Sequence, residues 1–177
     1  MTSAVSTVKH HYNAREQRKA LSVDEIEVLL SNAQSEEVVN FINLLRYTGL
    51  RTGEINKYEL RTIDGVECLD LTNASSLKTM SSFRVIPKHA QLKLMKFTLT
   101  VEYLSRVVKG LIDTHLEDTE KKTLYSLRHS FASELIQRGV RAEVVSELLG
   151  HAHKGMTLSR YAKGFSVEQL YDAVSKL

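Results

Sequence analysis

The sequence has little of what holds small secreted proteins or membrane proteins together. It has one cysteine, Cys68, so no disulfide can form within the chain, and we expect a reducing compartment such as the cytoplasm. Tryptophan is absent and proline occurs once, at Pro87. No apolar run is long enough to cross a bilayer, so we expect no membrane partner. The sequence has neither a metal-ligand cluster nor a phosphate-binding glycine loop, and we predict no metal and no cofactor.

What is present is typical of a globular domain. The chain has 177 residues, of which 42% are hydrophobic and 25% charged, enough for one domain with its own core. Its net charge of +3 is weak support for a nucleic-acid partner. Residues 1–20 hold four basic side chains and one acidic one. We interpret 1–20 as a basic leader or linker, either disordered or a DNA-contacting arm, and 21–177 as the domain.

Hydrophobic periodicity predicts a mainly helical domain with a small antiparallel sheet, the α+β class. Ser22 and Glu25 form a capping box before the first helix, and Gly49 is the predicted end of a second helix over 35–48. Further helices are predicted from Thr52 or Gly53 toward Leu60 and over 89–96, 100–115, 123–138, 141–149, 157–163 and 166–175.

Short strands are predicted on both sides of the Asp64-Gly65 turn, over 61–63 and 65–71. A hairpin of 77–79 with 83–86 follows and ends at Pro87, where a missing amide donor costs little. The sheet therefore falls in the middle of the chain, between two groups of helices.

Arg51 lies at a position that favours an anion. Arg51 follows a helix end and stands beside the backbone amides that open the next element, and Glu54, one turn on, is placed to hold it. Arg128 lies on a helix whose apolar stripe includes Phe131. Tyr125 precedes Arg128 by three residues, so both side chains can point at one phosphate.

Five stretches, in this order, resemble the catalytic domain of tyrosine recombinases, the phage integrase family. They are Tyr47–Ile55, the segment Ser82–Pro87 with Lys78 before it, Leu124–Ala132, Leu148–His151 and Thr157–Tyr161. The resemblance extends over about 21–165. It implies the tyrosine-recombinase catalytic-domain fold of the DNA breaking-rejoining enzymes.

The resemblance also implies a mechanism that needs neither metal nor ATP. Tyr161 attacks a DNA phosphorus and forms a 3′-phosphotyrosyl bond, while Arg51, Arg128 and His151 stabilise charge on the non-bridging oxygens. Lys78 protonates the departing 5′ oxygen. A 5′ hydroxyl from a partner strand then reverses the step, which gives site-specific recombination.

Tyr125 departs from the family pattern, in which most relatives have histidine. A tyrosine hydroxyl ordinarily ionises near about pH 10, so it is a poor base at pH 7, although it can donate a hydrogen bond to phosphate. This leaves an alternative in which the chain is a non-catalytic DNA-binding or regulatory relative. Arg84 is interpreted as a nonspecific contact to the DNA backbone. Tyr171 is the alternative nucleophile.

The expected partners follow from the same resemblance. They are double-stranded DNA and further copies of the chain, assembled on DNA as a tetrameric synapse. A separate N-terminal core-binding domain or accessory DNA-bending proteins would complete the assembly, which we place at the nucleoid of a bacterial or phage-encoded system. The last helix, 166–175, either docks on a neighbouring protomer or folds back on its own core.

Overall fold

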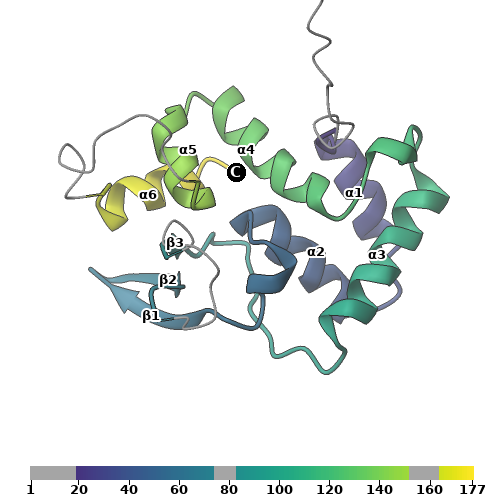
Figure 1. The fold of residues 1–177 in the computed structure, drawn as a ribbon, viewed down its shortest axis with the longest axis horizontal. Helices are drawn as coiled ribbons and strands as arrows, with labels where there is room; N and C mark the ends of the chain where they lie inside the picture. Colours follow the sequence, from purple (N-terminus) through teal and green to yellow (C-terminus); the bar gives the residue numbers. More distant parts are fainter. Residues whose placement is uncertain (1–18, 74–82, 152–163) are drawn as a thin grey trace, which may run out of the picture.

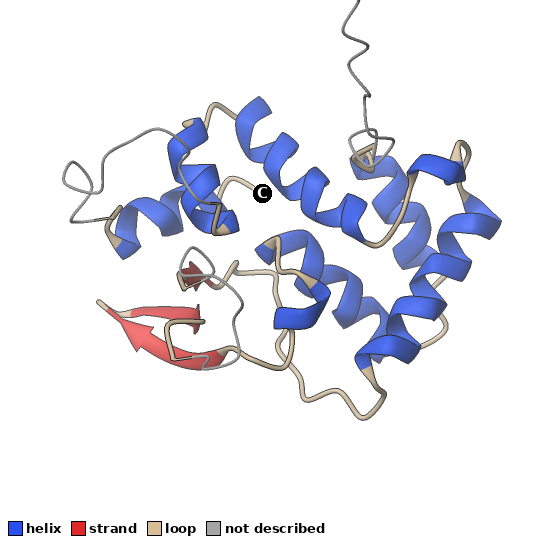
Figure 2. Ribbon diagram, viewed as in Figure 1, coloured by secondary structure: helices blue, strands red, loops and turns tan. Residues whose placement is uncertain are grey.

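A computed structural model describes residues 19–73, 83–151 and 164–177. The elements there are α1 (Val23–Ser31), α2 (Glu36–Thr48), the 3-10 turn η2 (Thr52–Glu54), β1 (Glu59–Ile63), β2 (Val66–Asp70), β3 (Val85–Pro87), α3 (Val101–His115), the 3-10 turn η4 (Thr119–Lys121), α4 (Tyr125–Gln137), α5 (Ala142–Leu149) and α6 (Val167–Val174). The predicted mainly helical domain with a small antiparallel sheet is confirmed (Figure 2).

The helices gather around α2, which packs against α3 and α4. On the other side of the molecule, α6 packs on β2 and β3, and α5 bridges α4 and α6 (Figure 1). Most of the α2 side chains are buried, including Phe41, Leu44 and Leu45. The core is therefore continuous from the helices to the sheet, through side chains that include Leu69 and Leu149.

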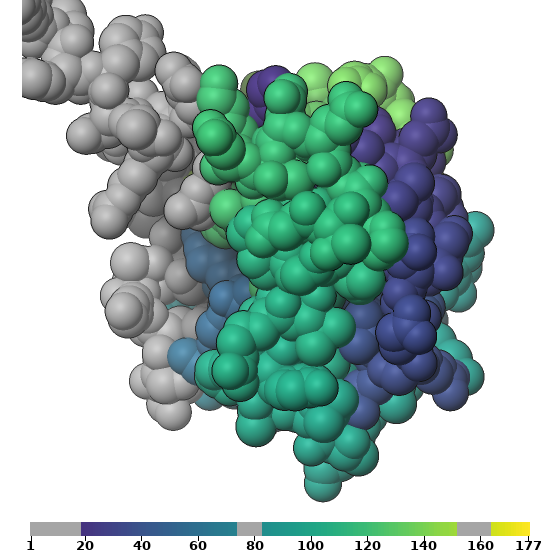
Figure 3. Space-filling model, turned by 90° about the vertical axis from the view of Figure 1, so that its right-hand side faces the viewer, coloured from purple at the N-terminus to yellow at the C-terminus, as the bar shows by residue number. Residues whose placement is uncertain are grey.

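The α3 helix shows how the periodic pattern becomes structure. Leu104, Val108 and Ile112 recur every four residues and are fully buried, and α1 packs against the same helix. The outer side of α3 occupies the centre of the face in Figure 3, with α1 beside it. Tyr103, on α3, is exposed. Thr100 caps the first turn by accepting a hydrogen bond from the Tyr103 amide.

The sheet is an antiparallel meander in the order β1-β2-β3. Asp64 and Gly65 join the first two strands with φ of 50° and 80°, the pair of positive values that a tight hairpin turn requires. Asp70 of β2 pairs with Glu59 on one side and Val85 on the other. Pro87 is the last residue of β3, as predicted.

Cys68 lies on β2 and is fully buried. Burial raises the pKa of its thiol to about 11, with a further contribution from the carboxylate of Asp70. The thiolate is therefore scarce at neutral pH, and Cys68 is not a candidate nucleophile.

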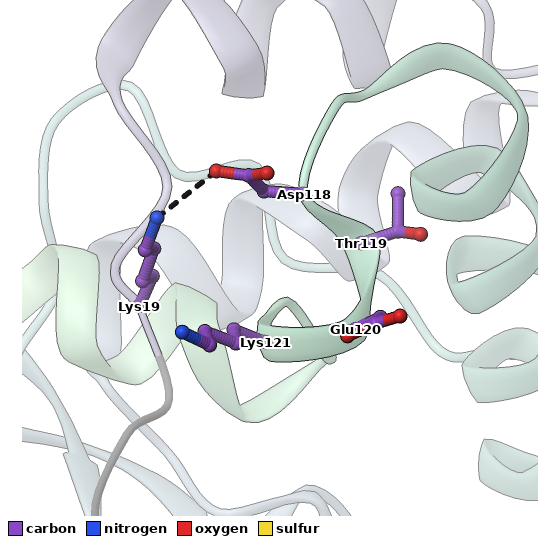
Figure 4. A pocket seen from close by; sticks show the side chains of 5 residues that line it. All are labelled: Lys19, Asp118, Thr119, Glu120 and Lys121. Carbon is purple, nitrogen blue, oxygen red and sulfur yellow. Dashed lines mark hydrogen bonds and ion pairs between the residues drawn. The ribbon is translucent and has the colours of Figure 1, made fainter.

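The start of the described chain is tied to the segment before α4. The Lys19 amide donates to the Lys121 carbonyl at 3.0 Å, and its ammonium pairs with Asp118 at 3.0 Å across a shallow pocket (Figure 4). Two residues on, Leu21 exchanges hydrogen bonds with the Ser130 hydroxyl of α4. Residues 1–18 lie outside the described ranges, so the boundary predicted at 21 stays a prediction.

The helix predicted from Thr52 or Gly53 toward Leu60 is wrong. One 3-10 turn forms over Thr52–Glu54, and the chain enters β1 at Glu59. Helix propensity here is weak because of Gly53 and Asn56, and pairing of Leu60 with Leu69 supplies backbone partners that a helix would have to replace.

The helix predicted over 89–96 is also wrong, and the segment is irregular. Its side chains bond across to α2 instead of along a helix: Tyr47 donates to Gln91 at 2.6 Å, and Asn40 donates to the Met95 sulfur at 3.1 Å. His89 stacks on Tyr47, with ring centroids 4.3 Å apart. Leu92 is buried within the same interface. Tertiary contacts override the local helical pattern here.

The remaining helices agree with the sequence apart from their ends. Those predicted over 100–115, 123–138, 141–149 and 166–175 correspond to α3, α4, α5 and α6. The α6 helix folds back on β3, β2 and α5 of its own chain, which is one of the two alternatives. The strand predicted over 77–79 and the helix over 157–163 lie outside the described residues. Within the described part of the chain, no helix is long and apolar enough to span a membrane.

Gly49 is required for two reasons. It ends α2 with φ of 60°, and a Cβ at this position would stand 2.7 Å from a Phe131 ring carbon and 2.9 Å from a Leu149 methyl. Gly139 shares the positive φ, at 79°, but its added Cβ would meet nothing within 4 Å. The two glycines thus separate the cost of the backbone conformation from the cost of crowding.

We predict that Gly49→Ala lowers the free energy of unfolding by about 2–4 kcal/mol, because left-handed strain and overpacking add. The control Gly139→Ala should lose only about 1–2 kcal/mol, from the backbone term. Urea unfolding followed by circular dichroism measures both. Equal losses in the two variants would contradict the close packing at Gly49.

Candidate anion-binding site

Arg51 stands where α2 ends and η2 begins. Its Nη1 donates to Glu54 Oε1 at 2.8 Å, and its backbone amide donates to Glu54 Oε2 at 2.9 Å, so the ion pair expected from the sequence is present. Its Nη2 reaches the Gly150 carbonyl at 3.5 Å. The side chain is 36% exposed, which leaves part of the guanidinium open to a ligand.

Arg128 lies on α4, one turn after Tyr125, and is buried. Its Nη1 donates to the Gly49 carbonyl at the end of α2, and its Nη2 donates to the Leu149 carbonyl at the end of α5, at 2.6 Å. Among the residues that the structure describes, no acceptor pairs with its Nε. Burial, with the positive charges of Arg51 and Arg84, lowers the pKa of Arg128 to about 10, so the guanidinium remains charged at neutral pH.

His151 completes this side of the site. Gly150 ends α5 with φ of 65°, and His151 follows with its backbone amide bonded to the Ser146 carbonyl at 3.0 Å. Its Nε2 stands 3.1 Å from Arg128 Nη2. A guanidinium only donates, so Nε2 accepts and we assign the ring hydrogen to Nδ1.

The electrostatics agree with a neutral imidazole. Partial desolvation, and then the charges of Arg128 and Arg51, lower the pKa of His151 below its usual value. The ring is therefore neutral near pH 7 and presents one N–H donor, at Nδ1, for another acceptor.

Tyr125 begins α4, and its ring meets the His129 ring edge-on, with centroids 5.0 Å apart. Tyr125 lies one turn N-terminal to the buried Arg128 on the same helix, and His129 directly follows Arg128. The structure thus keeps Tyr125 close to the arginine, and the pointing of both at one phosphate stays a prediction.

Arg84, for which the sequence predicts a contact with the DNA backbone, is buried. Its side chain is 2% exposed and forms a fork with Glu54, from Nη1 to Oε1 at 3.1 Å and from Nη2 to Oε2 at 2.9 Å. Its Nε donates to the Leu148 carbonyl at 2.8 Å. The contact with DNA backbone remains untested, but the side chain as found is turned inward. The inward position of Arg84 follows from the alternation of side chains along a strand, because residues two apart share a face and Ile86 is buried.

The cluster as a whole is strongly positive. The guanidinium groups of Arg51 and Arg84 both bond to the carboxylate of Glu54, which acts on the nearby Arg128 only through its charge. Guanidinium donors also meet the last three carbonyls of the α5 end: Leu148, Leu149 and Gly150. A helix C-terminus carries partial negative charge and so stabilises cations there. The excess of buried positive charge makes this a site for an anion.

Two predicted site residues, Lys78 and Tyr161, lie outside the described residues. The structure brings together Arg51, Arg128 and His151 at the end of α5, with Glu54 bonded to Arg51. In the described ranges, no group of three or more His, Cys, Asp and Glu side chains could hold a metal ion. The backbone carbonyls that orient the arginines could not be identified from the sequence, because any residue supplies one.

Comparison with known proteins places the chain in a family. The model of the phage integrase family matches residues 19–166. A tyrosine recombinase of Thermosipho africanus is 28% identical over 96% of this chain and 65% of its own length. Tyrosine recombinase XerD of Halalkalibacterium halodurans is 26% identical over 89% of this chain and 58% of its own length. The chain thus spans about three-fifths of these curated relatives.

Solved structures agree on the fold. The integrase of mycobacterium phage Brujita superposes with a TM-score of 0.60 at 18% identity, over 86% of this chain and 55% of that one. The XerH site-specific recombinase bound to palindromic difH, in a post-cleavage complex, gives 0.57 at 19% identity, over 82% and 51%. The chain therefore has the tyrosine-recombinase catalytic-domain fold.

Glu54 should make the domain acid-sensitive. Although burial opposes ionisation, the pairing with Arg84 and Arg51 dominates and lowers the pKa of Glu54 from 4.5 to about 2. A carboxyl group whose pKa is lower in the folded than in the unfolded state stabilises the fold at any pH above its unfolded pKa. This contribution, about 3 kcal/mol, is lost as the pH falls from about 4.5 toward 2. Glu54→Gln should therefore be much less stable than the parent at pH 7, with the gap narrowing at pH 3.

Urea unfolding at the two pH values measures the gap. Glu27→Gln is the control, because Glu27 also pairs with an arginine, Arg46, but its side chain is 57% exposed. Its effect should stay within about 1 kcal/mol at either pH. A Glu54→Gln penalty that does not change with pH would contradict the assignment.

Proposed function

The chain belongs to the phage integrase family, and on that premise we propose that it is the catalytic domain of a tyrosine-type site-specific DNA recombinase. The observation that carries the proposal is the grouping of two cationic side chains, Arg51 and Arg128, with the neutral His151 at the joined ends of α2 and α5. A scissile phosphodiester supplies the negative charge that the cluster lacks. Forked N–H donors suit phosphate oxygens in geometry as well as charge.

The proposed reaction uses the cluster in the transition state. The Tyr161 hydroxyl attacks the phosphorus, a P–O bond to tyrosine forms, and the bond to the 5′ oxygen breaks. Arg51, Arg128 and the N–H of His151 bind the non-bridging oxygens, where charge increases most. Lys78 gives a proton to the 5′ oxygen as it leaves. The phosphotyrosyl link keeps the phosphate activated, so resealing needs no external energy source.

Tyr125 takes a different part from the histidine of most relatives. Its phenol donates a hydrogen bond to a phosphate oxygen, and the proton of the nucleophile passes to another acceptor, such as solvent. His129 supports the ring of Tyr125 edge-on and is a positioning residue in this scheme. The substitution changes the proton transfer but leaves the phosphate clamp intact.

Double-stranded DNA is the proposed substrate, and four copies of the chain on two DNA duplexes form the proposed synapse. XerH, which shares the fold, was solved in complex with its difH substrate, and this supports DNA as the substrate. We also propose that an N-terminal core-binding domain or accessory DNA-bending proteins complete the clamp on DNA. The working place would be the cytoplasm, at the nucleoid.

Trapping a covalent adduct tests the proposal. The protein is incubated without metal with nicked suicide duplexes taken from its own genomic neighbourhood, and an adduct resistant to denaturation is sought. We predict that Tyr161→Phe keeps DNA binding and abolishes the adduct, since no hydroxyl remains to attack. Tyr171→Phe is the matched control and should still form it.

An adduct that survives in Tyr161→Phe and disappears in Tyr171→Phe would move the nucleophile to α6. Failure to form any adduct, with DNA binding intact and a clamp domain supplied in the assay, would favour the non-catalytic relative.

We further predict that Tyr125→Phe slows single-turnover cleavage about ten-fold, because one hydrogen bond to the phosphate is lost. The effect should appear in the rate of adduct formation and not in the affinity for uncleaved DNA. A complete loss of cleavage would instead give Tyr125 the proton-accepting role.

A further inference from the structure

Arg84 has contacts unlike those of an ordinary DNA-binding arginine. It precedes β3, continues the sheet through a hydrogen bond from the Leu71 amide to its carbonyl at 2.9 Å, and turns its side chain into the protein. A phosphate could reach the guanidinium only if the Glu54 fork opened. Opening a buried charge pair is costly because it leaves one charge buried without its partner. We therefore expect the pairing of Arg84 with Glu54 to persist when DNA binds.

The carboxylate of Glu54 connects Arg84 to Arg51 through hydrogen bonds. Its Oε1 accepts from the side chains of both arginines, and its Oε2 accepts from the Arg84 fork and from the Arg51 backbone amide. Four hydrogen bonds hold a carboxylate that is itself 4% exposed. The position of the Arg51 guanidinium therefore depends on a carboxylate whose orientation Arg84 determines.

Arg84 also holds the other side of the site. Its Nε donates to the carbonyl of Leu148. The next carbonyl along the helix, that of Leu149, accepts a hydrogen bond from Arg128. Gly150 and His151 follow directly. One buried guanidinium thus connects the segment that carries Arg51 to the helix end that carries His151.

We propose that Arg84 is a positioning residue for the anion site: its fork on Glu54 and its bond to Leu148 align Arg51 and His151, and it does not itself contact DNA. This inference rests on the proposed function of the same site. It replaces the direct phosphate contact suggested by the sequence.

A double-mutant cycle tests the proposal on the whole chain. The probe is a 30-base-pair duplex of mixed sequence, and the dissociation constant is measured by fluorescence anisotropy over a range of NaCl concentrations. Arg84→Lys keeps the charge but loses the fork. We expect it to weaken binding about ten-fold, the equivalent of one charge-assisted hydrogen bond from a misaligned Arg51.

The cycle separates positioning from direct contact. In an Arg51→Met background, Arg84→Lys should change the affinity by less than about two-fold, since the residue it acts through is gone. The slope of the logarithm of the affinity against the logarithm of the NaCl concentration should decrease in magnitude by about one for Arg51→Met. It should stay unchanged for Arg84→Lys. Additive losses with a reduced slope in Arg84→Lys would show a direct phosphate contact and overturn the proposal.

A second measurement does not depend on DNA. The Arg51 amide bonds to Glu54, so its hydrogen exchange reports the carboxylate position. Arg84→Lys should speed exchange of this amide about ten-fold. The control is Arg61→Lys in the same sheet, where the exposed Arg61 side chain pairs with the buried Asp70, and it should leave the exchange unchanged. Unchanged Arg51 exchange in Arg84→Lys would overturn the proposal.

If Arg84→Lys does not fold, Glu54→Asp gives the same two measurements, because it keeps all charges and shortens the carboxylate by one methylene. Loss of DNA affinity and of amide protection is again the expected result, and retention of both would overturn the proposal. A parent protein that shows no salt-dependent binding to the duplex would count against the proposed function alone. The exchange result would still decide the role of Arg84.

Discussion

The end of α5 is the feature on which the site depends. Arginine groups from three separate parts of the chain, Arg84, Arg128 and Arg51, donate to its last successive carbonyls. A helix end leaves such carbonyls without partners inside the helix, and its dipole makes them favourable to cations. The same bonds that satisfy the helix end therefore collect positive charge in one place. Gly150, in the left-handed conformation, ends the helix there and places His151 beside Arg128.

Arg128 joins this helix end to that of α2 through the Gly49 carbonyl. The junction is tight because Gly49 leaves room for Phe131 and Leu149. The core packing and the candidate anion site therefore depend on the same residues. A change in the packing of α4 on α2 would also move the guanidinium of Arg128. Glu54 offsets part of the charge without neutralising it, so the site keeps a net positive charge.

Local signals in the sequence predicted much of the fold. The capping box at Ser22, the glycine that ends α2 and the turn at Asp64 are present as expected, because caps and turns depend on neighbours in the chain. The segments 52–60 and 89–96 were predicted wrongly. Their conformations are determined by strand pairing in β1 and by side-chain bonds to α2, and both partners are distant in sequence.

The sequence by itself determined the fold class and the family. It also predicted the candidate site residues Arg51, Glu54, Arg128 and His151, since these lie in short segments whose order and spacing are characteristic. Only the tertiary structure decided what those residues bond to. Backbone carbonyls carry no residue identity, so the acceptors at Gly49 and along the α5 end could not be seen in the sequence. The burial of Arg84 is decided in the same way, because a charged side chain is stable inside only where a distant carboxylate and carbonyl meet it.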